Sequence, residues 1–553
     1  MKNIGKFILI LFVGITLGSC AKDWLDINKD PNVPTAPELS QLLSFSEYYM
    51  AQSLGQGNFL GDNLSSYVHQ SVSREVQNYG MDMQANNILN SWNYMYLYAL
   101  KDFDAIIDYA GEDNLIYAGI AKTLKAYTFS MMVDLWGDIP YSEFDVPGLI
   151  APHPDPSKDI YNALIGLLED GANDLQNTGA ANGYKPGSDD FYYAGNVAKW
   201  VRLNNTIRLK LLLQSRKAKS DVTDWQTKFN ALMSANSFIA SGEDFQFWYN
   251  EKTSPQDMRH PAFSGGYTGQ QTFYISPYFY ETMTGDTYNT VDNPFAGIKD
   301  PRVPYYFYNQ LAPGQTSENA YEYRNGTFMS IFFASNGPNS ARSNDKSLTK
   351  IGIYPCGGKY DDGKGGPVSL STGNGVAPHK MITYFALRFM LAELALTGET
   401  SGDARALLQD AMTAAFAHVN TVVVKQTGIP QIANADRDEY ISEILAKYDA
   451  ADANGKLRIL ITQKWIANFM NPIDSYTDYR RTGFPTLFDP SKTQIPGFGV
   501  NPTVTATSPE QVPLLNIASF PRSLYYPTNS ETELNPNLQQ KTNLSTPFVF
   551  WDK

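Results

Sequence analysis

Paired carboxylates are the residues of this 553-residue chain that most readily suggest catalysis. Asp134 and Asp138 form one such pair, and a glycoside hydrolase uses two nearby carboxyl groups as its acid and its base or nucleophile. The chain contains 56 acidic residues, however, so pairs like this one arise by chance. No Gly-x-Ser-x-Gly elbow of the serine hydrolases accompanies them. The sequence therefore predicts no catalytic residue.

One glycine-rich stretch comes close to a phosphate-binding loop. Gly358–Gly365 has glycines and a lysine at nearly the required spacing, but Gly365 stands where a hydroxyl should hold Mg²⁺. Asp361 and Asp362 would repel a phosphate, and no helical pattern follows. We expect a glycine-rich surface loop here.

Ligands for a metal ion are scarce and badly spaced. Asp26-Ile-Asn-Lys-Asp-Pro begins like a calcium loop, but Pro31 replaces the glycine of its sharp turn and Pro37 replaces the bidentate glutamate. No histidine is part of a His-Glu-x-x-His motif or of a close ligand pair; the five are His69, His153, His260, His379 and His418. The sequence predicts neither a metal site nor a cofactor.

Cys20 has a different chemistry. A short basic segment and an apolar run from Phe7 to Leu17 precede it. As a helix this run spans roughly 16 Å, whereas a bilayer core is about 30 Å thick, so it is typical of a secretory signal and not of a membrane span. Leu17-Gly18-Ser19-Cys20 resembles the lipobox of bacterial lipoproteins, in which the cysteine is acylated and the signal is cut before it. We expect residues 1–19 to be a signal peptide and Cys20 to be lipidated. The alternative is an ordinary signal peptide with an incidental cysteine.

Composition limits what the remaining chain can bind. Acylation of Cys20 would leave Cys356 without a partner, which predicts an inert thiol and no disulfide. The net charge of −13 argues against nucleic acid and against electrostatic docking on anionic lipid. Tyr, Phe and Trp number 35, 30 and 8, which suits either packed helices or a surface that binds flat ligands.

Helical periodicity dominates both halves of the chain and is interrupted in the middle. Residues 20–38 are typical of a lipidated N-terminus and tether, and the length of 39–553 suits one large domain or several. Between Glu243 and Ala377 the chain is rich in Gly, Pro, Asn, Ser and Tyr, which predicts loops and a few short strands. The expected helices are 39–54, 86–110, 114–135, 159–175 after Ser157 as N-cap, 196–217, 222–240, 380–396, 403–419 and 457–470. Consecutive helices of this kind predict a mostly α fold with tetratricopeptide-like pairs that support a large irregular ligand face.

A longer motif points to a family. Met132-Val-Asp-Leu-Trp-Gly-Asp-Ile-Pro-Tyr-Ser-Glu143 closely resembles a signature of the SusD/RagB family, the nutrient-binding lipoproteins of the Bacteroidetes outer membrane. Other segments agree with the family in the same order: Leu25–Asn32, Ala198–Asn205, Asp300–Arg302, Gln463–Ala467, Tyr479–Pro485, and Pro521–Arg522 with Tyr526–Pro527 and Asn535. Together they span nearly all of the mature chain.

The signature residues themselves indicate structure more than ligand binding. Trp136 is expected to end a helix by packing into the core, while Asp134 and Asp138 cap or brace the turn that follows. Arg480 and Arg481 are expected to hydrogen-bond carbonyls or carboxylates between segments.

The resemblance implies a single SusD-like domain over 39–553, with the loop-rich insertion at about 243–377, and a binding protein without catalysis. Members of the family lie at the cell surface as lipid-anchored lids over a SusC-type TonB-dependent transporter of the outer membrane, capture a nutrient, usually a glycan, and pass it to the barrel. The alternatives are a receptor for a peptide or another non-glycan nutrient and, from a different class, a glycoside hydrolase. Ligand-binding residues are not fixed by a motif in this family, so none is carried over by position.

Aromatic residues on loops are the remaining guide to the ligand site. We expect it in the irregular segment, where Trp248 has the largest ring and is the strongest candidate. For each candidate, packing in the core is the alternative interpretation. The predicted set is Trp248, Tyr249, Tyr267, Tyr274 and Tyr278, with Tyr67, Arg74 and Tyr79 from the segment before the second long helix.

Overall fold

A computed structural model describes residues 38–57, 59–73, 79, 86–268, 273–287, 292–317, 323–333, 346–487 and 518–553. The predicted signal peptide, the tether, Cys20 and Arg74 lie outside the described residues.

Helices of the N-terminal half are α2 (Leu39–Ser53), α3 (Leu60–Tyr67), α4 (Asn86–Asn93), the π-helix η1 (Tyr94–Leu100), α5 (Lys101–Ala110), α6 (Leu115–Trp136), α7 (Ser157–Gln176), α8 (Val197–Gln214), the 3₁₀-helix η2 (Arg216–Asp221) and α9 (Trp225–Ala235). Helices of the C-terminal half are α14 (Tyr384–Leu396), α15 (Ala404–Val423), α16 (Asn434–Ala450), α17 (Ala453–Ala467), α18 (Pro472–Thr482) and the π-helix η3 (Thr528–Thr532).

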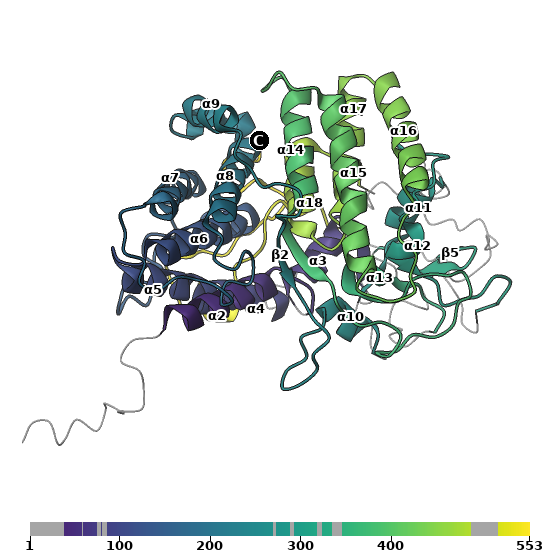
Figure 1. Ribbon diagram of the computed structural model, residues 1–553, viewed down its shortest axis with the longest axis horizontal. Coiled ribbons are helices and arrows are strands. Elements are labelled where there is room, and N and C mark those ends of the chain that lie inside the picture. The colour runs from purple at the N-terminus through teal and green to yellow at the C-terminus, as the bar shows by residue number, and fades with distance from the viewer. Residues whose placement is uncertain are drawn as a thin grey trace, which may run out of the picture.

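Consecutive helices pack against one another in two series. α5, α6, α7 and α8 contact in turn along the first series, and α14, α15, α16 and α17 along the second (Figure 1). The apolar residues that predicted these helices face inward: Leu124, Tyr127, Met131 and Leu135 of α6 are all buried. The predicted mostly α fold with helical pairs is confirmed.

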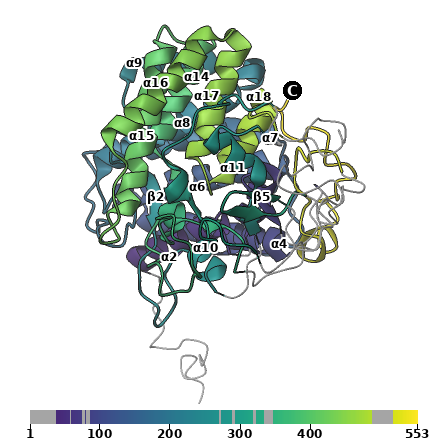
Figure 2. The ribbon, with the colours of Figure 1, turned by 90° about the vertical axis from the view of Figure 1, so that its right-hand side faces the viewer.

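Between Glu243 and Ala377 the described elements are short. The helices are α10 (Pro261–Gly266), α11 (Pro277–Thr284), α12 (Val303–Tyr306) and α13 (Ile353–Cys356). The strands, with β1 (Ser71–Ser73) and β8 (Pro378–Ile382) from outside the segment, are β2 (Phe245–Trp248), β3 (Phe273–Ile275), β4 (Phe307–Tyr308), β5 (Tyr323–Asn325), β6 (Phe328–Ser330) and β7 (Lys350–Ile351). They form two-stranded antiparallel sheets with the orders β1-β3, β2-β8, β4-β7 and β5-β6. In Figure 2, α10 and β5 lie below the helices α14 to α17.

Some helix boundaries differ from the prediction. The start of the expected helix 380–396 is strand β8, and α14 begins only after Thr383, whose hydroxyl accepts the Ala386 N–H. Ser157 is the first residue of α7 and Pro156 is its N-cap, while the Ser157 N–H donates to Asp138 Oδ1 over 2.7 Å. α16 was not predicted, because its short apolar stripe stands among many charged residues.

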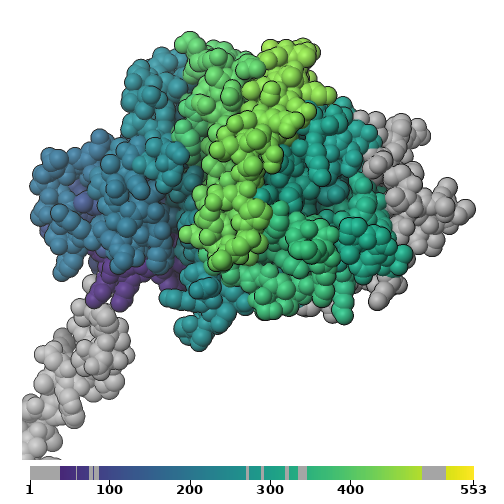
Figure 3. All heavy atoms as spheres, turned by 45° about the vertical axis from the view of Figure 1, so that its right-hand side comes forward, coloured from purple at the N-terminus to yellow at the C-terminus, as the bar shows by residue number. Residues whose placement is uncertain are grey.

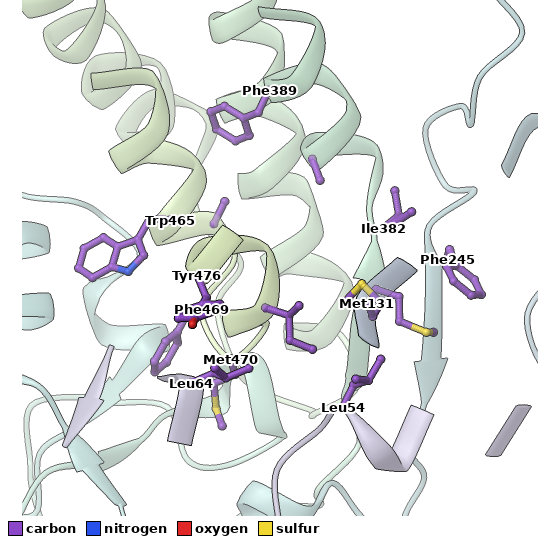
Figure 4. Packing of buried hydrophobic residues seen from close by; sticks show 14 of the residues in the cluster. Leu54, Leu64, Met131, Phe245, Ile382, Phe389, Trp465, Phe469, Met470 and Tyr476 are labelled. Atoms are coloured by element: carbon purple, nitrogen blue, oxygen red, sulfur yellow. The ribbon is translucent and has the colours of Figure 1, made fainter. Parts of the chain in front are cut away.

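One hydrophobic core joins both helical series to the irregular segment. Figure 4 shows side chains from α3, α6, β2, β8, α14, α17 and α18 meeting in it: Leu64, Met131, Phe245, Ile382, Phe389, Trp465 and Tyr476. The indole N–H of Trp465 donates to the Val68 carbonyl over 3.0 Å, so α17 is tied to the end of α3. In the space-filling view the N-terminal helices (purple and blue), the C-terminal helices (green) and the irregular segment (teal) pack side by side (Figure 3).

The family-like signature proves to be structural. Trp136 ends α6, is buried, and donates to the Tyr525 carbonyl over 2.8 Å. Asp134 accepts hydrogen bonds from Tyr161 Oη (2.5 Å) and Trp551 Nε1 (3.0 Å). Arg480 donates to the Asp134 carbonyl and Arg481 to Glu393, as expected for side chains that bridge segments. Along the described residues, none of the helices has both the length and the apolarity needed to cross a bilayer.

Candidate ligand-binding site

Trp248 is placed by the alternation of strand β2. Phe245 and Phe247 point to one face and are buried, whereas Gln246 and Trp248 point to the other and are half-buried. Pairing with β8 sets Trp248 opposite Pro378 and holds the strand in place. Trp248 is thus half-buried on the face of β2 opposite Phe247, and the ammonium of Lys425 lies over its ring, 5.2 Å from the centroid.

A cleft of about 880 Å³ opens beside Trp248, and we call it the Trp248 cleft. Its walls come from α2, the loop 188–191, and β2 with the loop that follows it. The apolar lining is Phe45, Tyr48, Phe191, Phe247, Trp248 and Met258, and the polar lining is Ser40, Gln41, Ser44, Ser188, Asp189, Asn250 and Gln256. Ligand sites in proteins combine largely apolar walls with a few polar groups at a comparable volume. Flat rings beside amides and hydroxyls suit a ligand with both an apolar face and hydroxyl groups, which describes a sugar.

The walls of the Trp248 cleft are held together by hydrogen bonds between distant segments. Ser44 Oγ donates to the Asp189 carbonyl over 2.9 Å, and Tyr192 Oη donates to the Glu47 carbonyl over 3.0 Å. On the opposite side, Gln256 Nε2 donates to Tyr48 Oη over 2.8 Å. A ligand therefore meets a site whose shape is largely formed before binding, which lowers the entropy cost of ordering it.

A buried carboxyl lies behind this wall. Glu47 is fully buried, and its pKa is raised well above the usual value, first by burial and then by the neighbouring Asp190. Asp190 accepts hydrogen bonds from the backbone N–H groups of Tyr192 and Tyr193 and from the indole of Trp200. Asp190 thus organises the loop as an acceptor, while burial favours the neutral form of Glu47.

The structure distributes the other predicted residues over three places. Tyr249 lies behind the Trp248 cleft, where it is buried and its hydroxyl accepts from Gln52 Nε2 over 2.7 Å. It stiffens the wall through its ring contact with Phe247, at a centroid distance of 5.3 Å, and presents no open face to the cleft.

Tyr267 and Tyr274 meet at a second, smaller pocket of about 270 Å³ between α3, α10 and β3. Both rings are buried. Tyr267 Oη donates to the Ile351 carbonyl over 2.6 Å and accepts the Lys359 N–H over 2.8 Å, so its hydroxyl serves the fold.

Tyr67, Tyr79 and Tyr278 gather around His69. Tyr79 Oη and His69 Nε2 lie 2.5 Å apart, and the ring of Tyr278 lies 6.2 Å from that of His69. Tyr67 and Tyr79 are buried, and their rings are 6.0 Å apart. Both His69 and Tyr79 have a left-handed backbone, at φ of 56° and 63°, which is uncommon for residues other than glycine.

Of the described residues that line the Trp248 cleft, only Trp248 belongs to the predicted set. Phe45 and Tyr48 lie in the expected helix 39–54, and Phe191 lies in a loop outside the predicted ligand segment. The buried face of α2 is formed by residues such as Leu43 and Met50, whereas Phe45 is 44% exposed. The signal in the sequence that could have identified Phe45 is its position outside the apolar stripe of the helix.

Other chemistry at the described residues is limited. No group of three or more His, Cys, Asp or Glu side chains in the part of the chain that the structure describes is arranged to hold a metal ion. Cys356 is buried, its thiol donates to the Gly352 carbonyl, and burial raises its pKa to about 12. The thiol is therefore protonated and unreactive in the folded protein.

Comparison with known proteins identifies relatives along most of the chain. Residues 31–500 match the profile of a SusD-like family described as "Starch-binding associating with outer membrane". No curated protein matches the chain.

Solved structures of the same fold cover nearly the whole chain. A chitin-binding protein superposes with a TM-score of 0.65 at 18% identity, over 93% of this chain and 100% of its own. A SusD/RagB family protein from Bacteroides thetaiotaomicron has a TM-score of 0.64 at 21% identity, over 94% and 99%. A chitin-binding SusD homologue from Flavobacterium johnsoniae has a TM-score of 0.60 at 20% identity, over 93% and 97%. At these identities the likeness concerns the fold.

Proposed function

This chain belongs to the SusD-like family, and from that premise we propose that it captures a glycan at the cell surface and delivers it to a SusC-type TonB-dependent transporter. The description of the family, starch-binding in association with the outer membrane, supports both the ligand class and the compartment. Two relatives of the same fold bear the name of chitin-binding proteins, which supports a polysaccharide ligand.

The observation that carries the proposal is the Trp248 cleft. Its lining includes Trp248 and Phe191 together with the amide residues Asn250 and Gln256. Aromatic rings can stack on the apolar faces of sugar rings while the amides bind the hydroxyl groups. No other predicted residue with a described side chain lines this cleft.

The protein acts by binding and not by catalysis. Asp134, the carboxylate that the sequence offered as a hydrolase acid, is buried in the core and hydrogen-bonded to Tyr161 and Trp551, so no substrate reaches it. Asp138 Oδ1 accepts the Ser157 N–H at the start of α7. Both carboxylates serve the fold.

The same proposal includes the organisation of the chain. Residues 1–19 are the signal peptide, 20–38 carry the acylated Cys20 and the tether, and 39–553 form one SusD-like domain. Two acyl chains or more bury enough methylene groups for stable anchoring, at about 0.8 kcal/mol each.

Calorimetric titration with starch, chitin oligosaccharides, xylan and a casein peptide digest tests the function. We expect binding of at least one glycan without release of new reducing ends. We also expect Trp248→Ala to weaken that binding by about 1–3 kcal/mol, as for other aromatic hot spots, and Trp248→Phe to weaken it less. Binding of peptides alone, or unchanged glycan affinity in folded Trp248→Ala, would contradict the proposal.

A further inference from the structure

A row of aromatic rings crosses the surface over α2 and η1, next to the Trp248 cleft. We call it the aromatic ledge, and its members are Phe45, Tyr49, Tyr94 and Tyr98. Phe45 and Tyr98 are 44% and 38% exposed, and Tyr49 and Tyr94 are half-buried. The ring of Tyr49 lies 4.4 Å from Phe45, 4.8 Å from Tyr98 and 4.9 Å from Tyr94, so the rings support one another. An exposed apolar patch of this kind on a folded chain marks a site of interaction.

The aromatic ledge continues the Trp248 cleft without a break. Phe45 belongs to both, because it lines the cleft and contacts Tyr49 and Tyr98 on the ledge. Tyr48 of the cleft wall contacts Tyr49 edge to face, at a centroid distance of 5.2 Å. A chain-like ligand that leaves the cleft past Phe45 therefore meets the ledge next. Figure 1 shows α2 and α4, the helix that precedes η1, along the lower edge of the molecule.

The far end of the ledge is built on a π-helix. η1 covers the seven residues Tyr94–Leu100, and this wider helix is rare in proteins and frequent at functional sites. It sets the rings of Tyr94 and Tyr98 5.4 Å apart and leaves Leu97 between them 51% exposed. Tyr94 packs against the buried ring of Phe59, at a centroid distance of 4.8 Å, whereas core packing does not explain why Leu97 and Tyr98 face outward.

Charge in the Trp248 cleft selects against anionic ligands. Asp189 is the one charged residue among the described lining residues of the Trp248 cleft, and its carboxylate accepts from Tyr117 Oη over 2.8 Å. Lys425 lies outside the lining, with its ammonium 5.2 Å from the ring of Trp248. The chain as a whole carries a net charge of −13. A uronate or sulfate group in the cleft would lose hydration without gaining a cationic partner from the lining.

We propose, on the basis of the function proposed above, that the ligand is an uncharged chain-like glycan that fills the Trp248 cleft and continues across the aromatic ledge. The cleft binds one end of the bound stretch through stacking and amide hydrogen bonds. The ledge adds stacking faces for the following sugar units. Affinity therefore rises with the length of the glycan, and this rise requires the rings of Phe45 and Tyr98.

Titration with two oligosaccharide series tests this inference. The probes are malto- and chito-oligosaccharides of two to seven units, together with soluble xylan, mannan and β-glucan, and polygalacturonate and alginate as acidic polymers. In the wild type we expect affinity to rise with chain length and the acidic polymers not to bind. In the double variant Phe45→Ala/Tyr98→Ala we expect the gain from length to disappear, a loss on the order of tenfold or more for long chains and little change for short ones.

Two matched variants keep the outcomes distinct. Tyr184→Ala removes a ring that is 72% exposed and belongs neither to the cleft nor to the ledge, and it should change no affinity. If the double variant does not fold, Tyr98→Ala alone serves, because its ring is partly exposed and lies outside the cleft.

Three results would overturn the inference. The first is unchanged long-chain affinity in the ledge variants, and the second is equal binding of acidic and neutral polymers. The third is retained glycan affinity in the ledge variants together with failure of the transporter to copurify with them, which would make the ledge a protein contact. Failure of the wild type to bind any glycan would instead reject the proposed function itself.

Discussion

Glu47 Oε2 accepts a hydrogen bond of 2.7 Å from the backbone N–H of Phe191, which lies 144 residues further along the chain. This contact fastens the loop that carries Phe191 to the helix that carries Phe45 and Tyr48. Both walls of the Trp248 cleft therefore depend on a side chain that is itself buried and out of the ligand's reach.

The pKa of Glu47 makes this contact sensitive to pH. Because the folded pKa is raised well above 4.5, the folded state holds a proton that the unfolded state releases above that value. The stability from neutral Glu47 is complete below pH 4.5 and is lost as pH rises through the folded pKa. Glu47→Gln stays neutral at every pH. Between pH 4.5 and the folded pKa of Glu47, we expect its free energy of unfolding to rise relative to the wild type by up to about 1.4 kcal/mol per pH unit.

Thermal unfolding between pH 4.5 and 8 measures this difference. Glu439→Gln, on the exposed face of α16, is the matched surface control. A constant offset for Glu47→Gln over the whole range would show that Glu47 is already ionised in the folded protein.

The C-terminus is held by a buried charge cluster. Asp552 is buried and accepts hydrogen bonds from Arg480 Nε over 2.9 Å and from the guanidinium of Arg522. Removing one member leaves the buried Arg480 without its counter-ion, so Asp552→Ala should lower the free energy of unfolding by about 3–5 kcal/mol in urea titrations. Asp362→Ala, which breaks an exposed pair with Lys364, should change it little. Equal effects of the two variants would mean that the cluster does not stabilise the fold.

Helix positions could be read from the sequence more reliably than the binding surface. The stripe of Leu124, Tyr127 and Met131 predicted α6, because periodic apolar residues need no knowledge of what covers them. Trp248 is a candidate from the sequence because a lone tryptophan in a polar segment stands out, and in the structure it lines the cleft. Phe191 could not be, because only the long-range contact with Glu47 brings it to α2.

The wider set of predicted aromatics shows the same limit. Tyr67, Tyr249 and Tyr267 lie in segments rich in turn-forming residues, yet all three rings are buried. Loop composition indicates that the backbone is irregular and does not reveal which rings point inward. The irregular segment contributes its own part of the core, for example Phe263 with Tyr267 and Cys356.

Lipidation is tested at Cys20. We expect Cys20→Ala to lose radiolabelled palmitate and to leave the membrane fraction, because no second acylation site is predicted. Cys356→Ala is the matched control, since that thiol is buried in the fold and its loss should leave labelling intact. Persistent labelling of Cys20→Ala would refute the lipobox assignment.

Association with the transporter is tested by pull-down from outer membranes in mild detergent at native expression. A SusC-type barrel should copurify, and single substitutions should not abolish the complex, because a stable interface buries more than about 1,000 Å². Recovery of the lipoprotein alone would count against a permanent complex.

The central claim is that a glycan binds in the Trp248 cleft, and a crystal structure of the protein with the tightest-binding neutral oligosaccharide tests it most directly. We predict density for a sugar ring against the indole of Trp248, hydrogen bonds from Asn250 or Gln256, and further units over Phe45 toward Tyr98. A saccharide bound elsewhere, for instance beside His69 and Tyr79 with the Trp248 cleft empty, would contradict the account.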